Sequence, residues 1–207
     1  ETGEYIEGDA TLAALAAADL EDGDTTVSAV NVSQRLVDVA EARDATLELT
    51  PIGSTNIIPR IRELAAAGEH VPVAGEGNGG VLFPDYRLAR DGAYTAARFL
   101  ELLGDRPASE VVAPYDGYEN VRVNLHYDSD AEREAMLAAA ETYAEAADAQ
   151  PTTIDGYRLD YGDGWVLARP SGTEPVVRVY AEAHSADRAA NLAGEMREAL
   201  DAAKAEA

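Results

Sequence analysis

The chain has 207 residues, and 39 acidic residues against 16 basic ones give a formal net charge of −23, which disfavours nucleic acid and anionic membranes as partners. It contains no cysteine, no apolar run near the roughly 20 residues of a membrane span and no opening signal peptide, so we expect a cytoplasmic protein without disulfides. All basic residues except Lys204 are arginines. The Debye length falls from about 10 Å at ordinary ionic strength to roughly 3 Å near molar salt, where the many carboxylates repel one another far less. The composition therefore favours a halophilic protein over an ordinary acidic one.

The first half of the chain alternates helical and extended patterns, which predicts an α/β layered domain. A first helix is expected from Asp9, which can cap it, with Leu12, Leu15 and Leu20 on one side. The next elements are strands and helices in turn. The strands are expected at Thr25 to Val30, Ala45 to Leu49 and Val71 to Ala74, and the helices start at Ser33 and Ser54.

The last helix of this half is expected to start at Asp91-Gly92 and to bury Ala96, Phe99, Leu100 and Leu103. The stretch from Gly104 to Ser109 then combines glycine, proline and charge, and it interrupts both periodicities. We therefore place the domain boundary there, with a first domain of residues 1–106 and a second of residues 107–207.

The second half predicts a two-layer α+β domain. A strand at Val121 to Tyr127 precedes an alanine-rich helix from Asp130 to Ala149, and a helix from Ser185 to Ala203 follows the strands. Asp155-Gly156 and Gly162-Asp163-Gly164 are typical of turns between strands. Trp165 is expected to anchor the core of this domain rather than to stack on a sugar. The remaining strands are expected at Thr152 to Ile154, Tyr157 to Tyr161, Trp165 to Ala168 and Val176 to Ala183.

The stretch RPSGTEPVVRVYAEA, from Arg169 to Ala183, surrounds one turn with groups that bind anions. Arginine supplies charge-assisted donors in a fixed fork, and Arg169 and Arg178 flank the turn. Ser171, Gly172 and Thr173 supply hydroxyls and backbone N–H groups, because glycine lets the main chain approach a ligand. The pattern fits a phosphate monoester, but a hairpin whose arginines pair with surface carboxylates explains the same residues.

Four glycines surround Glu76 and Asn78 in the run from Gly75 to Gly80. Such a run permits left-handed backbone conformations, and the carboxylate and carboxamide offer the acceptors and donors that sugar hydroxyls require. It lacks the spacing and the following helix of a dinucleotide-binding fingerprint. The run is therefore a candidate sugar-binding loop, with a plain tight loop as the alternative.

Together these stretches resemble the α-D-phosphohexomutase superfamily, which includes phosphoglucomutase, phosphomannomutase and phosphoglucosamine mutase. The run from Ala74 to Pro84, followed by Arg90-Asp91-Gly92, looks like the sugar-binding loop of the superfamily's third domain. The run from Arg169 to Pro175 resembles the phosphate-binding loop of its fourth domain. Because the order and separation also match, the resemblance implies an α/β third domain followed by a C-terminal domain like the TATA-box-binding protein.

The resemblance implies a mutase that transfers phosphate between O1 and O6 of a hexose through a bisphosphorylated sugar. In such enzymes a phosphoserine of the first domain exchanges the phosphoryl group, and an aspartate cluster of the second domain holds Mg²⁺. Neither motif is found in this sequence. The chain is therefore expected to be the C-terminal half of a mutase, without catalytic or metal-binding residues of its own, and its partners are a hexose phosphate and the N-terminal domains of the same polypeptide.

The resemblance also implies roles for particular residues in this half. The sugar is expected to be bound by Glu76, Asn78 and Gly79. The phosphate that is not reacting is expected to be bound by Arg169, Ser171, Gly172, Thr173 and Arg178. Fixing that phosphate would position the other end of the substrate, and positioning is a large part of phosphoryl-transfer catalysis.

Some residues depart from the pattern of better-known members. Gly80 stands where many relatives have histidine, and Gly53 is followed by Ser54 rather than by a histidine. Gly80 resembles the pattern of archaeal phosphoglucosamine and phosphomannose mutases, which favours these substrates, whereas the differences together remove groups that hold phosphate and hydroxyls in better-known members. A free-standing sugar-phosphate-binding module without catalysis is the alternative function. The three histidines of the chain are too scattered to predict a metal site.

Overall fold

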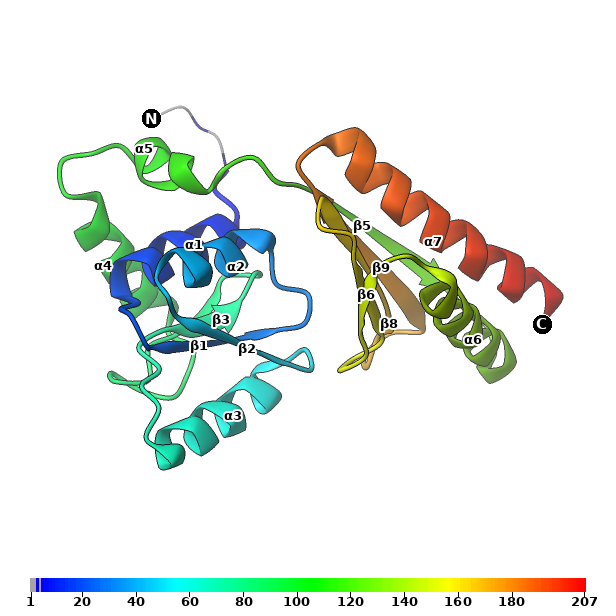
Figure 1. Ribbon diagram of the computed structural model, residues 1–207, viewed down its shortest axis with the longest axis horizontal. Helices are drawn as coiled ribbons and strands as arrows, with labels where there is room; N and C mark the ends of the chain where they lie inside the picture. Colours follow the sequence, from blue (N-terminus) through cyan, green and yellow to red (C-terminus); the bar gives the residue numbers. More distant parts are fainter. Residues whose placement is uncertain (1–2, 4) are drawn as a thin grey trace. The chain divides into compact units, whose positions relative to one another are not determined.

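The computed structural model describes residue 3 and residues 5–207 of the chain, which divides between Asp116 and Gly117 into two compact units (Figure 1). Each unit contains its own sheet and its own hydrophobic core. None of the helices in the described part of the chain is both long enough and apolar enough to cross a membrane.

The first unit is built on a four-stranded sheet in the order β2-β1-β3-β4. Strand β1 (Thr25–Ala29) pairs in parallel with β2 (Thr46–Thr50) and with β3 (Ala74–Glu76). Strand β4 (Gly80–Leu82) returns antiparallel to β3. Because β1, β2 and β3 run in one direction, the segments that follow them lie at the same edge of the sheet, where α/β proteins commonly bind ligands.

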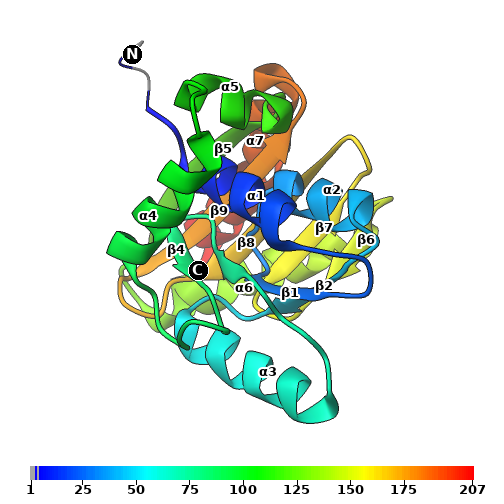
Figure 2. The ribbon, with the colours of Figure 1, turned by 90° about the vertical axis from the view of Figure 1, so that its left-hand side faces the viewer.

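Helices cover both faces of this sheet. Helices α1 (Gly8–Asp19) and α2 (Gln34–Ala42) pack on one face, and α3 (Ser54–Ala67) packs on the other (Figure 2). Leu12, Leu15 and Leu36 are buried in the first of these layers. The structure thus confirms the α/β layered domain that the alternating patterns predict.

The helix starts agree only in part with the sequence-based expectations. Ser33 and Asp91 cap the helices that are predicted to start at these positions, since each side chain accepts a backbone N–H of the first turn. Asp9 does not cap α1, because the helix begins at Gly8 and Glu7 takes the N-cap position. Ser54 is the first residue of α3, and Gly53 precedes it with a φ of 118°, a conformation that favours glycine.

The face that helix α4 (Gly92–Leu103) presents to the core agrees only in part with the one predicted. Leu100 is 65% exposed and Ala96 is exposed as well, so these two expectations were wrong. Phe99 and Leu103 pack against the core as predicted, and Tyr94 and Leu102 pack beside them in place of Ala96 and Leu100. Tyr94 contacts Phe83, the residue after β4, with 5.1 Å between the ring centroids. This contact orients α4 so that the face with Tyr94 packs against the core.

The first unit continues past the break on which the sequence-based boundary was placed. Helix α5 (Ala108–Val112) and a 3₁₀ turn (Ala113–Tyr115) follow Gly104 to Pro107 and still belong to this unit. Val111 and Val112 are buried against Ala10 and Ala14 of α1. Arg35 of α2 also donates its Nε–H to the carbonyl oxygen of Tyr115 at 2.8 Å. Because of these contacts, the first unit extends past residue 106 and ends at Asp116, and the second unit begins at Gly117.

The second unit is a five-stranded antiparallel sheet in the order β5-β9-β8-β7-β6, with two helices on one face. Its core includes Met136 of the first helix and Leu192 and Met196 of the second, all fully buried. The two-layer α+β domain is therefore confirmed. Its strands are β5 (Glu119–His126), β6 (Gln150–Thr152), β7 (Tyr157–Asp160), β8 (Gly164–Pro170) and β9 (Val176–Ala183), and its helices are α6 (Asp130–Ala146) and α7 (Ala186–Glu206).

Trp165 is buried as predicted, although it does not belong to the cluster of core residues under the helices. It alternates with Val166 along β8, and Val166 is the residue that faces the core under the helices. The Trp165 ring lies 4.3 Å from the guanidinium carbon of Arg158, and its Nε1–H donates to Glu182 at 3.2 Å. Burial lowers the pKa of Arg158, although Asp160 and Glu182 oppose this change. The sequence pattern did not predict this charged cluster.

Candidate functional site

The glycine-rich run forms the turn between β3 and β4, at the edge of the sheet where β1 and β3 end. Ser28 of β1 donates its hydroxyl to the carbonyl oxygen of Gly75 at 2.6 Å, which ties the start of the run to the sheet. Gly79 has a φ of 89° and donates its N–H to the carbonyl oxygen of Glu76 at 3.1 Å. The Asn78 side-chain oxygen accepts the N–H of Gly80 at 3.0 Å. Asn78 and Gly79 are exposed at this turn and accessible to a ligand.

Glu76 is held from two sides by residues that are distant in the sequence. It is only 5% exposed, and its Oε1 accepts the N–H of Gly53 at 3.1 Å. Its Oε2 forms an ion pair with Nη1 of Arg90 at 3.2 Å. Since a carboxylate has about four acceptor sites, both oxygens keep acceptor capacity for hydroxyl donors. The sequence motif includes Arg90 without predicting a role for it, and it does not predict that Gly53 is a partner of Glu76.

The turn also packs closely on the start of α1. A Cβ atom at Gly8 would overlap the backbone of Gly77 and Gly79, and one at Gly77 would overlap the carboxylate of Asp9. Arg90 lies over Gly80, where a Cβ would be 2.6 Å from its Cδ. Glycine is therefore required at Gly8, where the approaching atoms are backbone, whereas at Gly77 and Gly80 the side chains of Asp9 and Arg90 would have to move. Asp9, predicted as a helix cap, instead lies beside the turn.

The phosphate-loop candidates lie together in the hairpin of β8 and β9. Arg169 and Arg178 are directly opposite each other in the antiparallel register, so their side chains are on the same face of the sheet. Residues 171–175 form the connection between the two strands. The structure thus brings together, in one short hairpin, all five residues that the sequence assigns to phosphate: Arg169, Ser171, Gly172, Thr173 and Arg178.

Ser171 organises the connecting loop from inside. Its N–H donates to the carbonyl oxygen of Val176 at 2.8 Å, and its Oγ accepts the N–H groups of Thr173 at 3.4 Å and of Glu174 at 3.3 Å. Gly172 and Thr173 are exposed, and no heavy atom lies within 4 Å of the position that a Cβ on Gly172 would occupy. The loop is therefore open to a ligand at Gly172.

Both arginines contact carboxylates, which is the arrangement that the alternative reading of this hairpin predicts. Nε of Arg169 lies 3.1 Å from Oδ2 of Asp155, as an ion pair rather than an aligned hydrogen bond. Arg178 pairs through Nη2 with Glu174 of the loop. Burial opposes the charge of Arg178, but hydrogen bonds to Tyr180 and Glu174 outweigh this effect and raise its pKa. Two charged, largely covered guanidinium groups thus face each other in the hairpin.

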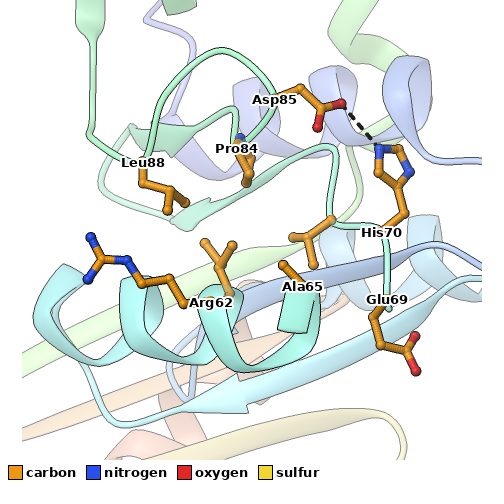
Figure 3. A pocket seen from close by; sticks show the side chains of 9 residues that line it. Arg62, Ala65, Glu69, His70, Pro84, Asp85 and Leu88 are labelled. Carbon is orange, nitrogen blue, oxygen red and sulfur yellow. Dashed lines mark hydrogen bonds and ion pairs between the residues drawn. The ribbon is translucent and has the colours of Figure 1, made fainter. Parts of the chain in front are cut away.

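A separate hollow of about 280 Å³ lies at the opposite edge of the first sheet. Figure 3 shows Arg62 and Ala65 of α3 facing the loop that carries Pro84, Asp85 and Leu88, with His70 at one end. His70 precedes β3 and Asp85 follows β4, so the hollow is at the amino-terminal end of β3, away from the Gly77–Gly79 turn. None of the sequence-predicted site residues lines it.

Across residue 3 and residues 5–207, no group of three or more histidine, aspartate or glutamate side chains is arranged to hold a metal ion. The described residues therefore do not fit the Mg²⁺ that the resemblance implies for the longer enzymes.

The chain matches two consecutive domains of one protein family. Residues 7–118 match "Phosphoglucomutase/phosphomannomutase, alpha/beta/alpha domain III", and residues 120–199 match "Phosphoglucomutase/phosphomannomutase, C-terminal domain". The chain belongs to the phosphoglucomutase/phosphomannomutase family. The two domain matches follow the same order as the two units of the structure, and they confirm the resemblance that the loops suggested.

Relatives within the family include archaeal proteins. The phosphoglucomutase/phosphomannomutase of Thermococcus kodakarensis is 34% identical over 91% of this chain and 41% of its own length. A probable phosphoglucosamine mutase of Methanopyrus kandleri is 34% identical over 94% of this chain and 43% of its own length. A solved family structure from Burkholderia thailandensis has a TM-score of 0.80 and 28% identity, covering 98% of this chain and 43% of that one. The chain thus spans less than half the length of these relatives.

Proposed function

We propose that this chain binds a hexose phosphate and forms the substrate-binding half of a phosphohexose mutase. The observation that carries the proposal is the arginine pair: Arg169 and Arg178 are directly opposite each other on either side of the open loop of residues 171–175. Two guanidinium forks beside the exposed Gly172 and Thr173 form a donor set suited to a phosphate monoester.

The first unit is proposed to bind the sugar. Glu76 supplies a carboxylate whose position is fixed by Gly53 and Arg90, and the exposed Asn78 and Gly79 supply further polar groups on the same turn. Sugar hydroxyls need acceptors and donors in fixed positions, and this turn lies at the sheet edge that α/β proteins use for ligands.

The whole enzyme is proposed to interconvert hexose 1-phosphate and hexose 6-phosphate through a bisphosphorylated intermediate. In this proposal the phosphoserine and the Mg²⁺-binding aspartates belong to other domains of the polypeptide, and the residues described here bind and orient the substrate. Phosphoglucosamine and phosphomannose are the proposed substrates, because the relatives are described as phosphoglucosamine mutases and as a phosphoglucomutase/phosphomannomutase.

Calorimetric titration with glucosamine 6-phosphate and mannose 6-phosphate, in a chloride buffer without phosphate, tests this function. The Arg169→Ala substitution removes one guanidinium fork, and hydrogen bonds to charged groups are worth about 1.5–3 kcal/mol. We therefore expect about 10- to 100-fold weaker binding. Arg197→Ala is the matched control, because Arg197 is an exposed arginine of α7 that is 3.9 Å from its own carboxylate partner, Asp201.

The melting temperature of each variant separates binding from folding. The proposal requires that Arg169→Ala loses affinity while its melting temperature stays close to that of Arg197→Ala. Wild-type affinity in Arg169→Ala would refute the assignment of the hairpin to phosphate. Mutase turnover by the purified chain, without any longer enzyme present, would refute the placement of the phosphoryl donor outside these residues.

A further inference from the structure

The two arginines of the hairpin have carboxylate partners of different kinds. Asp155 and Arg169 are both largely covered, with side chains 17% and 12% exposed. Glu174, the partner of Arg178, belongs to the open loop, and its side chain is 58% exposed. One carboxylate is therefore built into the sheet, whereas the other can leave its arginine by a movement of its own side chain.

The turn that carries Asp155 packs against the backbone of Ala168 and Arg169. Asp155 and Gly156 form the turn between β6 and β7, and Tyr157 pairs with Ala168 in the register of β7 and β8. Gly156 has a φ of 82°, and a Cβ there would overlap the carbonyl oxygen of Ala168 and the Cα and Cβ of Arg169. The turn therefore packs directly against the backbone of Arg169, and close packing of this kind limits its movement. The Asp155 carboxylate therefore restrains the Arg169 side chain.

The two carboxylates also contact different parts of their guanidinium groups. Asp155 contacts Arg169 at Nε, which leaves the terminal nitrogens outside this ion pair. Glu174 contacts Arg178 at Nη2, a terminal nitrogen of the kind that a phosphate would use in a forked contact. Glu174 thus occupies a position in which a phosphate oxygen would be bound, whereas Asp155 does not.

We propose that Asp155 is a positioning residue for phosphate and that Glu174 is an exchangeable counter-ion which the phosphate displaces. This inference rests on the proposed function, because it assumes that the arginine pair binds phosphate. Before phosphate binds, Glu174 balances the charge of Arg178. When phosphate binds, Glu174 moves into solvent and Asp155 keeps the Arg169 fork in place.

The sign of each mutational effect distinguishes these roles. Both carboxylates repel a phosphate electrostatically, so removing either charge would strengthen binding if charge alone mattered. Glu174→Gln should strengthen phosphate binding, and we expect an affinity about three- to fivefold tighter, which corresponds to the free energy of an exposed ion pair. Asp155→Asn should instead weaken binding by about fivefold or more, because an unrestrained arginine must be ordered when the ligand binds.

The experiment titrates the whole chain with inorganic phosphate and with glucosamine 6-phosphate, comparing Glu174→Gln, Asp155→Asn and Arg169→Ala. Asp163→Asn is the matched control, because Asp163 is an exposed carboxylate 3.0 Å from Arg188, in a different turn. We expect unchanged affinity in this control. Asp155→Glu, which restores the charge, should recover part of the affinity that Asp155→Asn loses.

The outcomes separate this inference from the proposed function. Wild-type affinity in Arg169→Ala would overturn the proposed function itself. If Arg169→Ala loses affinity but Asp155→Asn gains it, the positioning role of Asp155 is wrong. If Glu174→Gln weakens binding, Glu174 is part of the phosphate loop rather than a counter-ion. If Asp155→Asn lowers the melting temperature strongly, a second test uses NMR to follow the Nε–H resonance of Arg169 in the wild-type chain. This resonance should be sharp in the absence of phosphate. A resonance broadened by motion of the side chain would overturn the inference.

Discussion

His70 connects two parts of the first unit through its ring. Its Nδ1 lies 2.7 Å from a carboxylate oxygen of Asp24, just before β1, and its Nε2 lies 3.1 Å from one of Asp85, in the loop after β4. The hydrogen bond to Asp24 is the largest cause that raises the pKa of His70, and the hydrogen bond to Asp85 adds to it. The two contacts favour the protonated ring in the folded state.

This pKa shift predicts a pH-dependent stability. Because the folded pKa is above the unfolded value of about 6.5, the stabilisation is fully present below pH 6.5 and is lost as the pH rises through the folded pKa. His70→Gln should therefore reduce the difference between the urea midpoints measured at pH 5.5 and pH 8.5. The ring is more than half exposed, so the effect should be modest.

Asp85→Asn provides a graded check of the same prediction. It removes the second partner of His70 but leaves Asp24, so the pH dependence should lie between those of the wild type and His70→Gln. An unchanged pH dependence in both variants would contradict the proposed role of His70 in stability.

Residue types and spacing were sufficient to predict which side chains belong to the two loops, but not their partners. Glu76 and Asn78 are close neighbours within the first loop, and the residues from Arg169 to Thr173 are consecutive within the second. The partners of Glu76 are Gly53 and Arg90, and the partner of Arg169 is Asp155. These pairs depend on which strands and turns become neighbours, and spacing along the chain does not determine that.

At the scale of elements, two helical glycines in different surroundings provide a matched comparison. Gly8 begins α1, where a Cβ would overlap the backbone of the β3–β4 turn, whereas Gly194 lies within α7 with no heavy atom within 4 Å of its Cβ position. Gly8→Ala should lower the free energy of unfolding by about 1–3 kcal/mol, the usual cost of overpacking. Gly194→Ala should raise it by about 0.5–1 kcal/mol, because alanine favours the helix.

Urea unfolding of both variants, measured by circular dichroism, checks this comparison. Gly8→Ala should also weaken the binding of glucosamine 6-phosphate, since the displaced turn carries Asn78 and Gly79. Equal stabilisation of the chain by both substitutions would show that the turn does not pack on α1 as described.

The differences between predicted and observed elements have physical causes. The periodicity of α4 allows several apolar faces, and the contact of Tyr94 with Phe83 selects one that leaves Leu100 in solvent. The break at Gly104 to Ser109 is typical of a domain boundary, but the packing of Val111 and Val112 on α1 keeps the following residues in the first unit. In both cases a tertiary contact overrides a local signal.

At the scale of the whole molecule, the net charge of −23 leads us to propose that the protein is adapted to high salt. Carboxylates that repel one another at low ionic strength are screened near molar salt, where the Debye length is roughly 3 Å. The melting temperature should therefore rise in KCl between 0.1 and 2 M by more than in sucrose solutions of equal osmolality, because sucrose stabilises without screening charge. A response to KCl no larger than the response to sucrose would contradict this adaptation.

The sequence by itself determined the family, the order of the two domains, most strands and helices, and the loops that carry the candidate site. The family follows from the resemblance of two contiguous loop motifs, and the helices, strands and turns are encoded in turn glycines, capping side chains, and periods of two or 3.6. Only the tertiary structure decided that Glu76 is held by Gly53 and Arg90, that Trp165 contacts Arg158 and Glu182, and that Asp155 forms an ion pair with Arg169. The physical reason is that each of these contacts depends on strand order and register, which bring together residues that are far apart in the sequence.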